Sequence, residues 1–166
     1  MNLYEDALDQ ATLRASEIIS REDHECLLGD LYTVICEKCE NGLLINELNG
    51  IERIFYLIMT FQYVMNVAGI EQYYKNDSGD YANEAVEALL EVHANDMALI
   101  LDKGNSIFKN GIVPENIETR IEDMNAFDYK ERSWLFDELD DEYCNCVDTL
   151  DELVLAYILK NKEAFL

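Results

Sequence analysis

Basic residues are scarce in this sequence. Its 166 residues include twelve lysines and arginines against thirty-five aspartates and glutamates, which gives a formal net charge of −23 at pH 7. A surface with such an excess of negative charge repels nucleic acid and anionic membranes, whereas it attracts basic proteins and cations. We therefore exclude direct binding to nucleic acid or to a membrane, and we expect the partner to be a basic protein.

Proline and glycine are also rare, with one and seven residues respectively, and no segment of useful length alternates apolar and polar residues as a half-buried strand does. Apolar residues instead recur every three or four positions, which is the period of one helix face. Helices are expected near residues 4–19, 23–40, 46–66, 82–93, 96–108, 115–124, 130–143 and 149–161. The sequence thus predicts a compact all-α bundle of about eight helices, forming a single domain over residues 1–166 with an N-terminal helical pair at residues 1–45.

Targeting signals are missing as well. The first ten residues, MNLYEDALDQ, contain neither a basic region nor an apolar one, and no run of eighteen apolar residues occurs in the sequence. The five cysteines are an odd number without a secretion signal, which favours free thiols over a disulfide framework. These features predict a cytoplasmic protein.

No motif of a common enzyme class occurs: G-x-S-x-G, H-E-x-x-H and the glycine-rich phosphate loops are all missing. We therefore expect no catalytic residue, no metal and no cofactor, and we expect His93 to pack or to cap a helix. Four thiols, with His24 as a further ligand, leave zinc binding open as an alternative, although the first pair falls within a helical pattern. They are Cys36, Cys39, Cys144 and Cys146.

The segment from Ser133 to Glu152 holds eight acidic residues and no basic residue. Carboxylates three or four residues apart on a helix stand about 5–6 Å from each other, and phosphates on one DNA strand recur every ~3.4 Å of rise. A DNA-reading protein could accept such a row of charges in place of a phosphate backbone; a merely solvated helix face is the alternative. The predicted partner-binding residues are Asp137, Glu138, Asp140, Asp141, Glu142, Asp148, Asp151 and Glu152.

Two aromatic residues of the same segment, Trp134 and Phe136, flank Leu135. Exposed aromatic residues often anchor protein interfaces. A Trp and a Phe two positions apart beside a leucine are nevertheless more typical of core residues, so we expect both to be buried.

The stretch from Asn66 to Asp80, NVAGIEQYYKNDSGD, interrupts the apolar periodicity in the middle of the chain. It combines a small-residue corner at residues 68–69, an aromatic pair at residues 73–74 and a polar turn at residues 76–79. Glycine permits positive φ, and Asn, Asp and Ser bind their own backbone in turns. The stretch therefore predicts a corner at which helices meet.

This stretch resembles the signature N-x-G-G-[FI]-x-Q-[FY]-[FY]-x-N-x-x-G of a family of DNA-mimic proteins, and the resemblance continues from about residue 46 to residue 158. The sequence departs from the family pattern at Ala68, in place of the first glycine, and at His93-Ala94, in place of a glycine-alanine pair. The resemblance implies an all-α domain and, as for the characterised member, a negative surface that occupies the DNA-binding face of a transcription regulator. It also implies a structural role for the signature, with glycine at the corner, tyrosines in the core, and Gln72 and Asn76 tying backbone groups. The signature residues are Asn66, Gly69, Gln72, Tyr73, Tyr74, Asn76 and Gly79.

The leading hypothesis is a non-enzymatic, acidic DNA mimic that occupies the DNA-binding surface of a basic DNA-binding protein such as a transcription regulator. One alternative is an immunity-type or antirestriction inhibitor that caps the basic cleft of a nuclease. A second is a small metal-dependent enzyme that uses the cysteines, and a third is that the charge serves only solubility or adaptation to salt. The sequence leaves a homodimer open.

Overall fold

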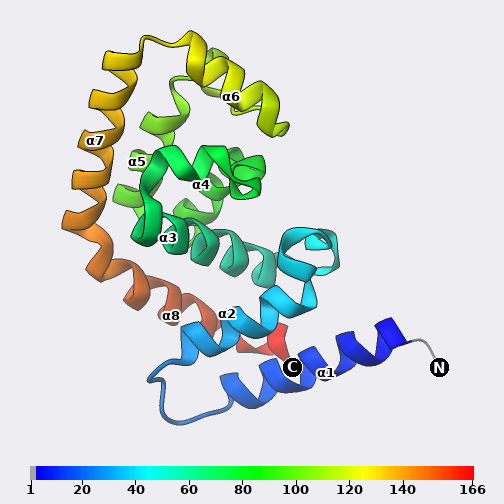
Figure 1. The fold of residues 1–166 in the computed structure, drawn as a ribbon. Coiled ribbons are helices and arrows are strands. Elements are labelled where there is room, and N and C mark those ends of the chain that lie inside the picture. The colour runs from blue at the N-terminus through cyan, green and yellow to red at the C-terminus, as the bar shows by residue number, and fades with distance from the viewer. Residues whose placement is uncertain (1–2) are drawn as a thin grey trace. The chain divides into compact units, whose positions relative to one another are not determined.

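The computed structural model describes residues 3–166, except for the side chains of residues 3–6 and of Asp148. Helices and turns, with no strand, make up this part of the chain, which confirms the predicted all-α class (Figure 1). The eight α-helices are α1 (Leu3–Ile19), α2 (Leu27–Lys38), α3 (Gly50–Lys75), α4 (Ala82–Glu91), α5 (Asn95–Asn105), α6 (Ile117–Ala126), α7 (Tyr129–Cys146) and α8 (Leu150–Lys160). Short 3₁₀ segments lie at Glu40–Gly42, Ile45–Glu47, Asp77–Tyr81, Lys109–Gly111, Val147–Thr149 and Lys162–Phe165.

Several helix boundaries differ from the prediction by a few residues, and two of the differences have a clear structural cause. α2 begins four residues later than expected, at Leu27, because Cys26 before it has a φ of 61°, in the left-handed region. α3 continues past its expected end near Asn66 as far as Lys75, and its backbone breaks inside the helix at Gly69, where φ is 77° and ψ is 179°. The predicted corner is therefore a break within one long helix.

The described chain divides into two compact units. One unit runs up to Tyr56 and includes Val154–Leu166, and the other is Leu57–Leu153. α3 and α8 each contribute residues to both units. The single domain over residues 1–166 stays a prediction.

The unit that contains both termini is built on the contact between α1 and α2. Asn49 and Glu52 form a capping box at the start of α3: the Asn49 side chain accepts from the backbone N–H of Glu52, and Glu52 accepts from that of Asn49, both at 3.0 Å. Lys38 of α2 pairs with the same buried Glu52 at 2.7 Å, so this cap also joins two helices. The buried residues of α1 and α2 are Ala11, Ala15, Ile18, Ile19, Leu27, Leu31, Val34 and Ile35.

In the unit Leu57–Leu153, α5 packs against both α4 and α7 (Figure 1). An aromatic cluster fills its core, in which Tyr73 meets Phe61 edge to face at 5.2 Å between ring centroids and Tyr74 meets Phe108 at 5.0 Å. The Tyr74 hydroxyl donates to Asn105 Oδ1 at 2.7 Å. Tyr73 and Tyr74 are thus fully buried, and the buried hydroxyl of Tyr74 has its hydrogen-bond acceptor in the buried side chain of Asn105.

Within residues 3–166, α3 is the one helix whose length and composition would allow it to cross a membrane. Half of its most apolar window is buried against the rest of the structure. Such a helix is weak evidence for a membrane span, because the core helices of soluble proteins share these properties.

Arg120 of α6 is completely buried and donates four hydrogen bonds to backbone carbonyl oxygens at 2.7–2.9 Å. The acceptors come from two separate segments, the end of α3 with the turn after it and the loop before α6, and we call this arrangement the Arg120 cradle. They are the carbonyl groups of Tyr74, Asn76, Pro114 and Glu115. A buried cation is tolerated only when its donors are satisfied in this way.

Two further residues complete the Arg120 cradle. The carboxylate of Asp80 lies 2.6 Å from Arg120 Nη2, at an angle that makes an ion pair without a hydrogen bond. Gly79 is buried, and a Cβ atom there would lie 2.9 Å from Arg120 Nε and 3.0 Å from the carbonyl oxygen of Tyr73. Only glycine lets the turn approach the guanidinium this closely.

Arg120→Met is expected to lower the free energy of unfolding by about 3–5 kcal/mol, because four carbonyl groups and one carboxylate lose their cation. Arg120→Lys, which keeps the charge but has fewer donors in another geometry, should lose less. Urea unfolding measures both. The control is Lys130→Met, which removes the same charge from an exposed position; equal losses at Arg120 and Lys130 would contradict the role of the cradle.

α4 ends in a Schellman motif with an unusual residue. The N–H of Ala94 donates to the carbonyl of Leu89 at 2.9 Å, and that of His93 donates to Leu90 at 3.0 Å. His93 occupies the position of this motif where glycine is preferred, with a φ of 63°. Its side chain is exposed. His93 therefore caps the end of α4 through its backbone, not through its imidazole. α5 then begins at Asn95, one residue before its expected start near residue 96.

His93→Gly is expected to raise the free energy of unfolding by about 1 kcal/mol, because it removes the cost of a left-handed residue that has a Cβ atom. His93→Ala keeps the Cβ atom and should give no such gain. Thermal or urea unfolding of the two variants beside the parent chain tests this, and a gain in the alanine variant as large as in the glycine variant would refute the backbone explanation.

Candidate functional site

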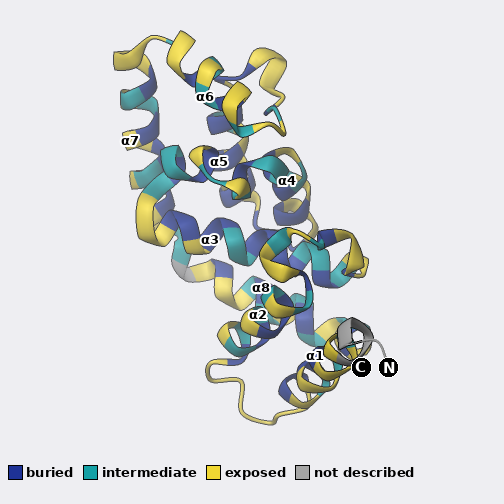
Figure 2. Cartoon of the chain, turned by 45° about the vertical axis from the view of Figure 1, so that its right-hand side comes forward, coloured by how far each residue is buried: buried dark blue, intermediate teal, exposed yellow. Residues whose placement is uncertain are grey.

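α7 carries the candidate acidic interface, and its own sequence sets which face is exposed. Asp128 caps the helix by accepting from the N–H groups of Lys130 and Glu131, both at 3.0 Å. The buried stripe recurs at three- and four-residue steps, as one helix face must, and leaves the opposite face in solvent (Figure 2). The buried residues of α7 are Arg132, Phe136, Leu139 and Tyr143.

Three of the predicted acidic residues, Asp137, Glu138 and Asp141, lie exposed on this outer face. We call them the α7 acidic row. None of their carboxylates forms an ion pair or hydrogen bond with a described side chain. At 1.5 Å of rise per residue, Asp137 and Asp141 are about 6 Å apart along the helix axis. Glu152, at the start of α8, is likewise exposed.

Three other predicted residues are occupied by contacts inside their own unit. Asp140 accepts from the backbone N–H of Ile70 at 2.9 Å. The carboxylate of Glu142 pairs with Lys103 Nζ of α5 at 2.9 Å. Asp151 accepts from Gln62 Nε2 of α3 at 2.8 Å. Asp148 lies outside the residues whose side chains are described.

The contact of Asp140 explains the break in α3. At Gly69 the helical hydrogen-bond ladder is interrupted, and the short helical segment that follows needs an acceptor for its first N–H groups. Asp140 of α7 supplies one for Ile70. A Cβ atom at Gly69 would lie 2.4 Å from Asp140 Oδ2, and a φ of 77° with a ψ of 179° is a conformation that essentially only glycine adopts.

Burial raises the pKa of the Asp140 carboxyl above its ordinary value, and the neighbouring charges of Asp137, Asp141 and Glu71 raise it further. The hydrogen bond from Ile70 opposes this shift. Ionisation of the Asp140 carboxyl therefore costs stability, and the hydrogen bond from Ile70 offsets only part of that cost.

Other signature residues bind one another inside the unit Leu57–Leu153. Asn66 Oδ1 accepts from the hydroxyl of Tyr143 at 2.8 Å, which joins α3 to α7. Gln72 Nε2 donates to Asn76 Oδ1 at 2.7 Å. The expectation that the Gln72 side chain ties a backbone group is thus wrong, because its partner is a side chain; the backbone contact at Asn76 is made by its own carbonyl with Arg120.

Trp134 is 82% exposed, so the expectation that it lies in the core is wrong. Phe136, two residues further on, is buried as predicted. The helical period explains the difference: residue 136 continues the buried stripe of α7, whereas residue 134 falls on the outer face beside the α7 acidic row.

The cysteines do not assemble into a metal site in the part of the chain that the structure describes. No group of three or more His, Cys, Asp or Glu residues there is arranged to hold a metal ion. Burial raises the pKa of Cys36 to about 11 and also raises that of Cys39. Metals bind the thiolate form, so these thiols are poorly suited as ligands.

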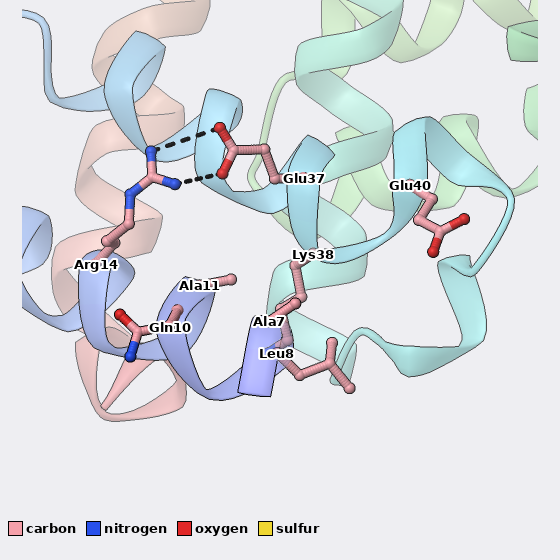
Figure 3. A pocket seen from close by; sticks show the side chains of 8 residues that line it. All are labelled: Ala7, Leu8, Gln10, Ala11, Arg14, Glu37, Lys38 and Glu40. Atoms are coloured by element: carbon pink, nitrogen blue, oxygen red, sulfur yellow. Dashed lines mark hydrogen bonds and ion pairs between the residues drawn. The ribbon is translucent and has the colours of Figure 1, made fainter. Parts of the chain in front are cut away.

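A separate groove lies between α1 and α2 (Figure 3). Nη1 and Nη2 of Arg14 donate to the carboxylate of Glu37, and Lys38 is paired with Glu52. The basic groups that line this groove are thus neutralised by their neighbours, and the groove offers no unpaired cation to a ligand.

A family model described as DMP19-like protein matches residues 46–161 of the chain. No curated protein and no solved structure matches it. The matched region contains Arg120 and its cradle, the break at Gly69 and the α7 acidic row, and it excludes α1, α2 and the groove between them.

Asp140→Asn should keep the acceptor for Ile70 and remove the partly buried charge, so at neutral pH the variant is expected to be at least as stable as the parent. Asp140→Ala removes the acceptor and should lose about 1 kcal/mol. Because the folded-state pKa of Asp140 is raised, the folded parent binds this proton more tightly than the unfolded chain does, and its stability falls as pH rises from the ordinary pKa through the folded one.

The advantage of the asparagine variant over the parent should therefore shrink as pH falls through the raised folded-state pKa of Asp140, and it should be lost below about 4, near the ordinary pKa of Asp. Urea unfolding of parent and variant at a series of pH values measures this difference, because contributions from groups that do not interact with Asp140 cancel. Identical stability losses in Asp140→Asn and Asp140→Ala would show that Asp140 does not cap the second part of α3.

Proposed function

Because the chain belongs to the DMP19-like family of DNA-mimic proteins, we propose that it acts without catalysis, by placing its acidic surface on the DNA-binding face of a basic protein. The proposed partner is a DNA-binding protein such as a transcription regulator. DNA and this chain would then compete for the same basic residues.

The α7 acidic row is the observation that carries this proposal. Asp137, Glu138 and Asp141 are exposed on a regular helix and free of ion pairs with described residues. Their spacing of one helical turn, about 6 Å along the axis, is close to two phosphate steps of a DNA strand, about 7 Å of rise. Basic residues positioned for phosphates therefore meet negative charges at a similar interval.

Long-range attraction supports the same role. With a net charge of −23, the chain attracts a basic protein over distances limited by the Debye length, about 8 Å at physiological ionic strength. Such attraction speeds association and weakens steeply with salt. We also expect the protein to act in the cytoplasm.

The first experiment is a pull-down from a lysate of the source cell with the folded chain as bait, eluted by a salt gradient. We expect a basic DNA-binding protein that duplex DNA displaces from the bait. Recovery of a nuclease alone would favour the inhibitor alternative, and the absence of any basic protein at low salt would refute the proposal.

The triple variant Asp137→Asn, Glu138→Gln, Asp141→Asn should weaken binding to the recovered protein by about tenfold or more, since each exposed charge contributes up to about 1 kcal/mol. A matched control, Glu87→Gln, Glu91→Gln, Glu122→Gln, changes the net charge equally at exposed positions outside α7. Binding is measured by competition with labelled duplex DNA at 50 and 200 mM salt. Equal weakening in both triple variants would mean that only net charge matters and not the α7 acidic row.

A further inference from the structure

We propose that Trp134 anchors an arginine side chain of the basic partner, whose guanidinium stacks on the indole while carboxylates of α7 bind its N–H groups. This inference rests on the proposed function and deepens it, because it names the residue type that the partner must present. It assigns an interface role to Trp134, whose exposure the acidic surface alone does not explain.

Exposure is the first argument. Trp134 is 82% exposed and is the one tryptophan in the sequence. No ring or cation among the described residues stacks on it. With Tyr129 and Ser133 it lines a shallow, mainly apolar depression at the start of α7. Exposed tryptophan beside charged residues is typical of the anchor positions of protein interfaces.

Charge is the second argument. Glu131 precedes Trp134 by three residues, and Asp137 and Glu138 follow it by three and four, so carboxylates stand one helical turn away on both sides, at about 5–6 Å between Cβ atoms. All three are exposed. One basic residue, Lys130, also borders the depression. Three carboxylates against one lysine leave an excess of negative charge around the indole.

These two features together select arginine. A guanidinium is planar, so its face can lie on an indole while its N–H groups reach carboxylates at the ring edge. The ammonium group of lysine has no such plane, and an apolar side chain would bury the carboxylates without a partner. Arginine is also the residue with which proteins bind phosphates in two-point contacts, so a DNA-binding face is rich in it.

The same helix turn already contains one pairing of this kind within the chain. The guanidinium carbon of Arg132 lies 5.6 Å from the centroid of the Tyr129 ring, and Arg132 Nη2 lies 3.8 Å from Glu71. A cation here is thus held by a ring on one side and a carboxylate on another. Trp134 offers the same combination to a cation from outside.

Tyr63 provides a matched comparison. It is an exposed aromatic residue of the same unit, 60% accessible on α3. The residues one turn away, at positions 59, 60, 66 and 67, include no carboxylate. It should therefore lack any preference for arginine.

Two labelled, helix-forming peptides test the inference, one of alanine and arginine and one of alanine and lysine, with equal length and charge. Fluorescence anisotropy at low salt measures their binding to the parent chain and to the Trp134→Ala and Tyr63→Ala variants. We expect the parent to bind the arginine peptide about threefold to tenfold more tightly than the lysine peptide. Trp134→Ala should abolish this ratio, and Tyr63→Ala should leave it unchanged.

The emission of Trp134 gives a second readout, because no other tryptophan is present. It should change on addition of the arginine peptide and much less with the lysine peptide. A change with protein concentration alone would show that a second copy covers this face, and a change with neutral phospholipid vesicles but not with peptide would show a membrane contact; either result would overturn the inference.

The outcomes also separate this inference from the proposed function. If Trp134→Ala displaces labelled DNA from the recovered partner as well as the parent does, while the triple amide variant of the α7 acidic row does not, the mimic stands and the anchor is refuted. If neither peptide nor any basic protein binds in a salt-dependent way, both proposals fail.

Discussion

The buried guanidinium of Arg120 holds together the part of the chain on which everything else in its unit depends. Its carbonyl acceptors lie at the end of α3, in the turn after it and in the loop before α6. One acceptor is the carbonyl of Tyr74, a residue of the aromatic core. Gly79 lies so close to the Arg120 side chain that a Cβ atom at this position would clash with it. Two residues of the signature, Tyr74 and Asn76, thus give their carbonyl groups to a side chain of the same chain, which agrees with the structural role that the resemblance implies.

Most of the fold could be predicted from apolar periodicity, because each helix buries one face and its period is visible locally. The central interruption was also visible, since glycine and the polar turn stand out from the apolar segments around them. The Arg120 cradle could not be predicted, because all its acceptors are backbone carbonyls, which no side-chain pattern marks, and two of the four are 44 and 46 residues away. One signal existed: Arg120 falls between Ile117 and Met124 on the apolar stripe of α6.

The eight carboxylates of the candidate site look alike in the sequence, but their surroundings divide them. Ile70, Gln62 and Lys103, which occupy three of them, lie 70, 89 and 39 residues away, so no local pattern could separate occupied carboxylates from free ones. Trp134 is different. Its exposure follows from the phase of the α7 stripe that Arg132, Phe136 and Leu139 define, and a closer use of that phase would have placed it outside.

The three occupied carboxylates have a consequence for the free ones. Asp140, Glu142 and Asp151 tie α7 and the start of α8 to α3 and α5 at several levels along their length. The α7 acidic row, on the same helix as Asp140 and Glu142, is thereby preorganised, so its backbone has little conformational freedom to lose on binding. Duplex DNA is also stiff, and in the proposed role a rigid helix would match that stiffness as well as the charge.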